Sequence, residues 1–181
     1  MVKDHLERSK DFDAVMFGAF PNLVYVKCLK AQMEKIGFFT APASAHHHGN
    51  YAGGLFDHSY AVTKALIDLT ERLDLKWELK RSPYIVGMFH DLCKVNQYTE
   101  QEDGTFEYNK EQTLNGHGEK SIMLLQKYMD LTEEELLCIR WHMGAFDDQK
   151  NWNLYTRAVQ KYPNVLYAHT ADMIASQIWG V

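Results

Sequence analysis

The feature of this sequence that most constrains its fold is a spaced series of histidine and aspartate residues. Six of them follow one another as His58, the pair His90-Asp91, His117, His142 and Asp172. The gaps from 58 to 90, 91 to 117, 117 to 142 and 142 to 172 are 32, 26, 25 and 30 residues, about one helix and its connection each time. Because each of the six lies in a stretch with a helical pattern, we expect successive helices to bring them to one centre.

The residue types indicate what such a centre would bind. Imidazole and carboxylate groups without thiolates suit a hydrolytic divalent ion better than a structural zinc site. Taken singly, each residue has a simpler interpretation, as a histidine satisfied by a hydrogen bond or an aspartate in an ion pair. Taken together, they predict one or two divalent transition metal ions, and iron, manganese, nickel and zinc are all compatible with the ligands.

Length and charge limit the class of protein. The 181 residues, 46% hydrophobic and 24% charged, predict a single domain over residues 1–181. Within it we expect a helical extension over about residues 1–39 and a metal-binding core over about 40–180. The net charge of −5 provides no basic field for phosphate backbones, which disfavours a dedicated nucleic-acid-binding protein.

Cysteine usage and hydropathy bear on the compartment. The three cysteines, Cys28, Cys93 and Cys138, are odd in number and lack a C-x-x-C pair, which favours a reducing cytoplasm. The segment from Met1 to Asp13 is charged throughout and has no apolar secretory region. No apolar run approaches the roughly 20 residues that a membrane helix needs. We therefore expect a cytoplasmic protein without a membrane partner, and the oligomeric state stays open.

Apolar periodicity predicts a mainly α-helical fold. Asp103-Gly104, between Tyr98-Thr99 and Thr105-Phe106, predicts a small β-hairpin near residues 97–109. Thr132 and Glu135 have the spacing of a capping box at a helix start. Helices are predicted over residues 22–37, 55–73, 83–94, 117–128, 132–142, 153–161 and 164–179.

The predicted helix over 83–94 is apolar on nearly every side, which is typical of a central, buried helix. His90 and Asp91 fall in its middle. Burying a lone carboxylate costs several kcal/mol or more unless it is paired or bound to a metal. Asp91 should therefore have a cationic partner, and it is the natural bridge between two ions.

The order of these residues resembles the HD-domain superfamily of metal-dependent phosphohydrolases, in the fuller variant with two extra histidines before the last aspartate. The resemblance covers about residues 40–180 and implies a compact HD-domain helical bundle. Two segments are similar to those of HD modules in bacterial 3′-to-5′ exoribonucleases: His48-x-x-Tyr51-x-Gly53-Gly54-Leu55-x-x-His58 and Ala168-His169-x-Ala171-Asp172.

The resemblance also implies roles for the residues. One ion would be surrounded by His58, His90, Asp91 and Asp172, and a second by His117 and His142 with Asp91 bridging. His90-Asp91-Leu92-Cys93-Lys94 is similar to the H-D-x-x-K form of bacterial cyclic-dinucleotide phosphodiesterases, in which the lysine meets the substrate phosphate. Alternatively, Lys94 is a solvated residue at a helix end. The chain departs from that subfamily after His142, where Met143-Gly144-Ala145-Phe146 follows without a Gly-Tyr-Pro sequence.

Three further residues are candidates for substrate contacts. His47 and His48 lie in a loop before the first ligand, where they would bind a substrate phosphate or simply face solvent. Trp141, beside His142, would stack on a base or belong to the core.

These observations predict a phosphohydrolase that cleaves a phosphomonoester or phosphodiester by a metal-activated water, with a nucleotide as the favoured small substrate. Asp91 and Lys94 are the catalytic candidates, the first orienting the water and the second neutralising phosphate charge. One alternative is a 3′-to-5′ exonuclease on single-stranded nucleic acid, for which Lys150, Arg157 and Lys161 are the basic candidates. Another is a non-catalytic metal-binding sensory module.

Overall fold

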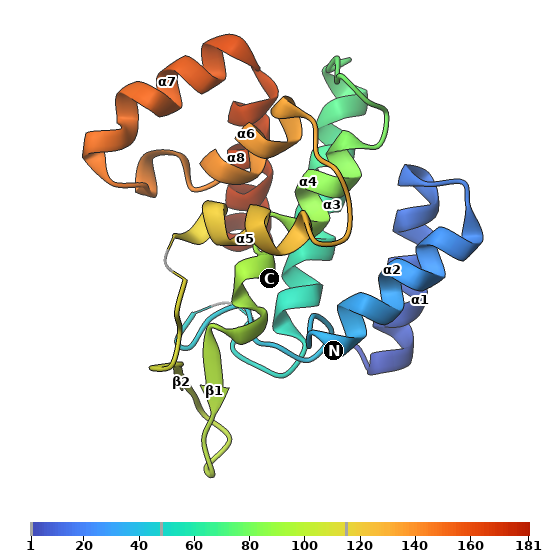
Figure 1. Cartoon of the computed structure of the whole chain (residues 1–181), viewed down its shortest axis with the longest axis vertical. Helices are drawn as coiled ribbons and strands as arrows, with labels where there is room; N and C mark the ends of the chain where they lie inside the picture. Colours follow the sequence, from blue (N-terminus) through green and yellow to red (C-terminus); the bar gives the residue numbers. More distant parts are fainter. Residues whose placement is uncertain (1, 48, 115) are drawn as a thin grey trace.

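A computed structural model describes residues 2–47, 49–114 and 116–181 of the chain. The described part is mainly α-helical with a small two-stranded sheet, which confirms the predicted fold class (Figure 1). In chain order its elements are α1 (His5–Ala19), α2 (Leu23–Lys35), α3 (Gly54–Arg72), α4 (Ser82–Phe89), the 3₁₀-helix η1 (Leu92–Asn96), β1 (Tyr98–Glu100), β2 (Phe106–Tyr108), α5 (His117–Leu125), α6 (Glu133–Trp141), the 3₁₀-helices η2 (Gly144–Phe146) and η3 (Gln149–Asn151), α7 (Trp152–Lys161), α8 (Asn164–Met173) and the π-helix η4 (Ile174–Trp179).

Helices α3 and α4 pack against each other at the centre of the molecule. Helices α1 and α2 lie on one side of this pair, and α5, α6 and α8 lie on the other (Figure 1). Five buried phenylalanines join α1, the segment after α2, α3 and α4: Phe12, Phe38, Phe39, Phe56 and Phe89. Their ring centroids lie 5.1 to 6.4 Å apart, and each buried ring stabilises the fold by roughly 1.5–3 kcal/mol.

Local capping signals fix where several helices begin. The Thr132 hydroxyl accepts the backbone N–H of Glu135, whose carboxylate accepts the backbone N–H of Thr132, which confirms the predicted capping box. Asp4 and Glu7 form a second capping box at α1. These interactions satisfy N–H groups that have no partner within the helix.

The predicted hairpin is confirmed. Strands β1 and β2 pair antiparallel, with Tyr98 opposite Tyr108, and Gly104 adopts φ +80° in the turn. The Asp103 carboxylate accepts hydrogen bonds from the backbone N–H and the hydroxyl of Thr105. The hairpin projects from the helical body (Figure 1).

The prediction of one helix over 83–94 is wrong in a way that matters for the site. Helix α4 ends at Phe89, and the chain turns through His90 and Asp91 before η1 begins. Asp91 has φ −103° and ψ 18°, outside the α-helical region. A continuous helix would aim two consecutive side chains about 100° apart, whereas this turn lets both face one centre.

Two other boundaries differ from those predicted. Helix α5 ends at Leu125 rather than Tyr128, and the final helix changes from α to π geometry after Met173. The Ser176 hydroxyl donates to the carbonyl of Asp172 at 2.8 Å near that change. Such wide turns interrupt the regular backbone ladder and often occur at functional positions.

None of the helices in the described ranges combines the length and the apolar character needed to cross a lipid bilayer.

A buried ion pair fixes α1 against the start of α3. The Arg8 guanidinium donates to both carboxylate oxygens of Asp57, at 3.0 and 2.9 Å, and both side chains are almost fully buried. The Tyr51 hydroxyl donates to the same carboxylate at 3.0 Å. Burial and the neighbouring Asp57 carboxylate raise the pKa of Tyr51 to about 12. Because Asp57 directly precedes His58, this network also sets the position of that histidine.

We expect Arg8→Ala to lower the free energy of unfolding by about 3–5 kcal/mol, since it leaves the Asp57 carboxylate buried without its cation. The matched control is Arg72→Ala, which removes an exposed pair with Asp68 and should leave the melting temperature unchanged. Denaturant unfolding of both variants measures the difference. Equal stability of the two variants would contradict a stabilising role for the buried pair.

Candidate metal centre

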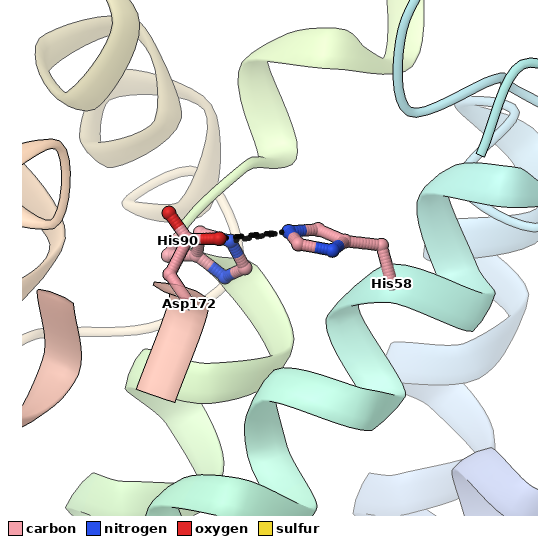
Figure 2. Close-up of side chains that lie close together, drawn as sticks. All are labelled: His58, His90 and Asp172. Atoms are coloured by element: carbon pink, nitrogen blue, oxygen red, sulfur yellow. Dashed lines mark hydrogen bonds and ion pairs between the residues drawn. The ribbon is translucent and has the colours of Figure 1, made fainter. Parts of the chain in front are cut away.

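The six residues of the predicted ligand series come together at one place in the structure, with His90 and Asp91 from the turn after α4 and the other four from four further segments. His58 and His90 face each other from α3 and the end of α4, and Asp172 approaches them from α8 (Figure 2). The His58 Nε2 atom lies 3.3 Å from His90 Nε2 and 3.2 Å from an oxygen of Asp172. The ligand atoms of these three residues all lie within 4.8 Å of one another, close enough to share one ion.

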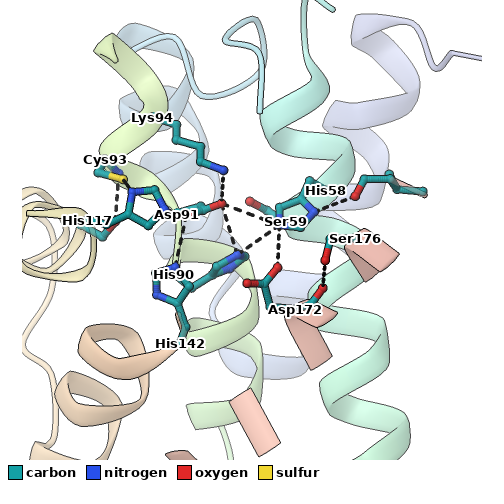
Figure 3. A network of polar contacts seen from close by, with 12 residues as sticks. His58, Ser59, His90, Asp91, Cys93, Lys94, His117, His142, Asp172 and Ser176 are labelled. Atoms are coloured by element: carbon teal, nitrogen blue, oxygen red, sulfur yellow. Dashed lines mark hydrogen bonds and ion pairs between the residues drawn. The ribbon is translucent and has the colours of Figure 1, made fainter. Parts of the chain in front are cut away.

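Asp91 lies between this group and the remaining histidines (Figure 3). Its Oδ1 atom is 2.7 Å from His117 Nε2 and 3.4 Å from His142 Nε2. Its Oδ2 atom is 3.5 Å from His90 Nε2 and 3.7 Å from His58 Nε2. One carboxylate therefore faces all four imidazoles, the position expected of a bridging ligand.

Backbone carbonyls set the orientation of three of these rings. The Nδ1 atoms of His58, His90 and His142 lie 2.7 to 2.8 Å from the backbone oxygens of Val181, Gly87 and Ile139, respectively. Because a carbonyl only accepts, the ring proton lies on Nδ1 and the neutral imidazole directs its Nε2 lone pair toward the cluster. Histidines that bind metals are held by the same arrangement.

Two buried atoms at the middle of the cluster lack a hydrogen bond. These are Asp91 Oδ1 and His142 Nε2, which lie 3.4 Å apart, and His117 Nε2, although 2.7 Å from Asp91 Oδ1, does not form an aligned hydrogen bond with it. An unpartnered buried polar atom costs about 1–3 kcal/mol, and a cation between the two would satisfy both. The donor set and these two atoms therefore fit a divalent ion.

The electrostatics of the metal-free protein agree with this. Burial raises the pKa of Asp91, but the Lys94 ammonium at 2.7 Å, together with His117 and His90, outweighs burial and holds that pKa well below its usual range. The Asp91 carboxylate is consequently charged and ready to bind a cation. Burial lowers the pKa of Lys94, and the Asp91 carboxylate reverses this to a net increase.

The pKa values of two candidate ligand histidines are shifted in opposite directions. Burial lowers the pKa of His90 to about 3, so that its imidazole is neutral and able to bind a metal. Burial also disfavours protonated His142, but the Asp91 carboxylate overcomes this and raises its pKa. In the metal-free protein a proton on His142 thus competes with a metal for the same lone pair.

Cys93 is a neighbour of the cluster that sequence reasoning missed. Its Sγ atom lies 3.2 Å from His117 Nδ1, while His117 Nε2 faces Asp91 (Figure 3). Burial and the Asp91 charge raise the pKa of the thiol to about 12 in the metal-free protein, where the thiol is protonated and its contact with Nδ1 orients the imidazole. Its position two residues after Asp91 was the available signal.

The cluster opens into a cavity of about 820 Å³, a size typical of small-molecule sites. His58, Asp91, His117 and Asp172 line it, whereas His90 and His142, each 1% exposed, lie behind them. The predicted residues His47 and Lys94 also line the cavity, and His48 lies outside the described residues.

Several other lining residues were not singled out from the sequence as site residues: Tyr98, Tyr108, Phe146, His169, Ser176 and Gln177. The spacing of His169, one helical turn before Asp172, was the available signal for that residue. Trp141 is buried in the hydrophobic core, which decides between the two interpretations given above.

No family model matches the chain. No solved structure matches it. A curated relative, the dihydroneopterin 2′,3′-cyclic phosphate phosphodiesterase of Methanocaldococcus jannaschii, is 38% identical over 71 residues. These residues are 38% of this chain and 28% of the relative, so the match covers less than a third of that protein's length.

We expect Asp91→Ala to lose bound transition metal, because it removes the carboxylate that faces all four imidazoles. The matched control is Asp130→Ala, which changes an exposed aspartate outside the cavity lining. Elemental analysis of protein purified without chelators, with circular dichroism to verify folding, measures the effect. Equal metal content in the two folded variants would contradict the centre.

The metal-free protein should lose stability as the pH falls from 6.5 toward 3. In this range the unfolded chain protonates His90, whose ordinary pKa is 6.5, while the folded protein does not until about pH 3. The raised pKa of His142 stabilises the folded protein as the pH falls, but this contribution changes only above pH 6.5. We expect the melting temperature of chelator-treated protein to fall between pH 6.5 and 4, and His90→Asn to reduce that slope. An unchanged slope in the variant would show that His90 is not the titrating group.

Proposed function

We propose that this protein is a metal-dependent phosphohydrolase that cleaves a small phosphodiester, such as a cyclic phosphate, in the cavity above the cluster. One observation carries the proposal: the Asp91 carboxylate and three candidate ligand residues, His58, His117 and Asp172, line an open cavity beside the ammonium of Lys94, with the buried His142 Nε2 atom 3.4 Å from Asp91 Oδ1. The name of the partial relative, a cyclic phosphate phosphodiesterase, supports the same reaction class. The order of the ligands is also what the resemblance to the HD-domain superfamily implies, and membership in that superfamily stays a prediction.

The residues that would hold the metal fall into three overlapping groups. His58, His90 and Asp172 form the first, and His90, Asp91 and His142 form the second. Asp91, Cys93 and His117 form the third, in which His117 lies 2.7 Å from Asp91 and lines the cavity. A divalent ion bound there supplies a nucleophile by lowering the pKa of water and polarises the phosphoryl group.

The chain's own residues divide the remaining work. Lys94 Nζ lines the cavity beside Asp91, where its positive charge favours a phosphate oxygen and the negative charge that develops during hydrolysis. The Asp91 carboxylate is available as an acceptor that orients the attacking water. Water then adds to phosphorus, one phosphorus–oxygen ester bond breaks, and the departing alkoxide takes up a proton, leaving a monoester and an alcohol.

The lining of the cavity favours a small substrate over a polymer. Lys94 is the lysine or arginine that lines it within the described part of the chain. The basic candidates for a nucleic-acid path lie elsewhere, with Lys150 paired to Asp148 and Lys161 paired to Glu133. A chain of nucleotides needs several cations along its backbone. An exonuclease is therefore the weaker alternative.

A non-catalytic sensory module is also less well supported. Structural metal sites close their coordination with protein ligands, whereas four of the ligand residues here line an open cavity. The opening leaves room for water and substrate next to the cluster.

The protein reconstituted with Mn²⁺ should hydrolyse nucleoside 2′,3′-cyclic phosphates, and chelation should abolish turnover. We expect Lys94→Met to lower kcat about 100-fold with metal content retained, because it removes a charge that stabilises the transition state. Lys127→Met, at an exposed position outside the cavity, is the control. Phosphate-ester turnover by chromatography measures both variants, with single-stranded oligonucleotides as competing substrates. Faster degradation of oligonucleotides would favour the exonuclease, and full activity of metal-replete Lys94→Met would contradict the role of this lysine.

A further inference from the structure

Three aromatic side chains line the cavity beside the metal cluster without belonging to the core. Tyr98, Tyr108 and Phe146 lie in the cavity wall, and none of them packs into the hydrophobic core of the described residues. Phe146 is 69% exposed and Tyr108 is 61% exposed. An exposed phenylalanine forgoes most of the stabilisation that burial of its ring would give. The stability of the fold therefore does not explain why these rings lie exposed in the cavity wall.

Phe146 is held in place by a specific arrangement of η2 and α8. Gly144, which begins η2, adopts φ +54°, and a Cβ atom there would lie 2.7 Å from the His169 ring. His169 Nδ1 donates to the carbonyl oxygen of His142 at 2.7 Å, which fixes the imidazole. The Phe146 ring lies against it, with centroids 6.3 Å apart. The exposed ring is thus connected, through His169, to the backbone of a candidate metal ligand.

The hairpin supplies the other two rings. Tyr98 and Tyr108 face each other across β1 and β2, with ring centroids 5.2 Å apart and planes at 51°. Such a cross-strand pair stabilises a hairpin, but this accounts only for the contact between the two rings. It does not account for their place in the wall of a cavity whose floor is the metal cluster.

The cavity lining includes uncharged polar groups in addition to Lys94 and the residues of the cluster. The amides of Gln97 and Gln177 and the hydroxyl of Ser176 line the same cavity. Amides and hydroxyls both donate and accept, so they can pair with the ring nitrogens and carbonyls of a heterocycle. A polymer would need more cations than Lys94 supplies.

We propose that this wall, formed by Tyr98, Tyr108 and Phe146, binds a flat heteroaromatic ring such as a purine, which is joined to the phosphate that reaches the metal cluster. The inference rests on the proposed phosphohydrolase function and specifies its substrate class. Phe146, backed by His169, provides a stacking face, and the hairpin tyrosines provide a second aromatic surface. The remote ring then contributes binding energy that positions the phosphate.

The test compares two substrates that differ only in the ring. Guanosine 2′,3′-cyclic phosphate carries a purine, and methyl β-riboside 2′,3′-cyclic phosphate carries the same cyclic ester without one. With the Mn²⁺-loaded protein we expect a KM at least 10-fold lower for the guanosine compound. Phe146→Ala and Tyr108→Ala should each raise that KM about 10-fold or more and leave the KM for the methyl riboside unchanged.

Matched variants separate stacking from general damage. Phe17→Ala removes an exposed phenylalanine on α1, outside the cavity, and should change neither KM. Phe146→Tyr keeps an aromatic face and should retain the low KM for the guanosine compound. Equal KM values for both substrates, or an equal loss for both in Phe146→Ala, would overturn the ring subsite while leaving the phosphohydrolase proposal intact.

Absence of turnover on both substrates would count against the proposed function instead. Calorimetric titration with guanosine alone then still decides the subsite. Binding by the wild-type protein that Phe146→Ala abolishes would support it, and no detectable binding at millimolar guanosine would overturn it.

Discussion

The buried carboxylate of Asp91 is the group around which the rest of this molecule is arranged. It is 2% exposed and carries a charge, so its removal from water has to be balanced by cations or by groups that can bind one. Lys94 and His90 from its own segment surround it, together with His58, His117 and His142 from segments far apart in the sequence. Each contributing helix must therefore begin or end at a set distance from the same point. The lengths of the connections between ligands follow from that requirement.

The framework around this group is held from two directions at His58. The Arg8–Asp57 ion pair fixes α1 to Asp57, the residue directly before His58. The backbone oxygen of Val181 accepts the Nδ1 proton of His58. Elements from opposite ends of the described chain thus determine the orientation of one imidazole. A ring held on both sides loses little further conformational entropy when it binds a metal, which favours a preformed centre.

Much of this arrangement could be predicted from the sequence, because helices with one apolar face leave a periodic signal. The regular spacing of the six residues was enough to predict that they converge, and the Asp103-Gly104 turn was enough to predict the hairpin. The end of α4 at Phe89 was not predictable, since apolar periodicity continues through the turn and carries no information on the dihedral angles of Asp91. The contact of Cys93 with His117 and the exposure of Phe146 depend on tertiary placement, which no local pattern records.

The aromatic wall and the candidate metal centre lie on different parts of the scaffold. The ligands lie on helices or helix ends that form the core, whereas Tyr98, Tyr108 and Phe146 lie on a projecting hairpin and a short 3₁₀ turn that contribute little to it. If these rings bind the substrate as proposed, replacing either of these peripheral pieces would change the recognition surface and leave the candidate metal centre in place. A lineage built on this scaffold could accordingly diversify what it recognises through small insertions at two places, with little penalty in folding.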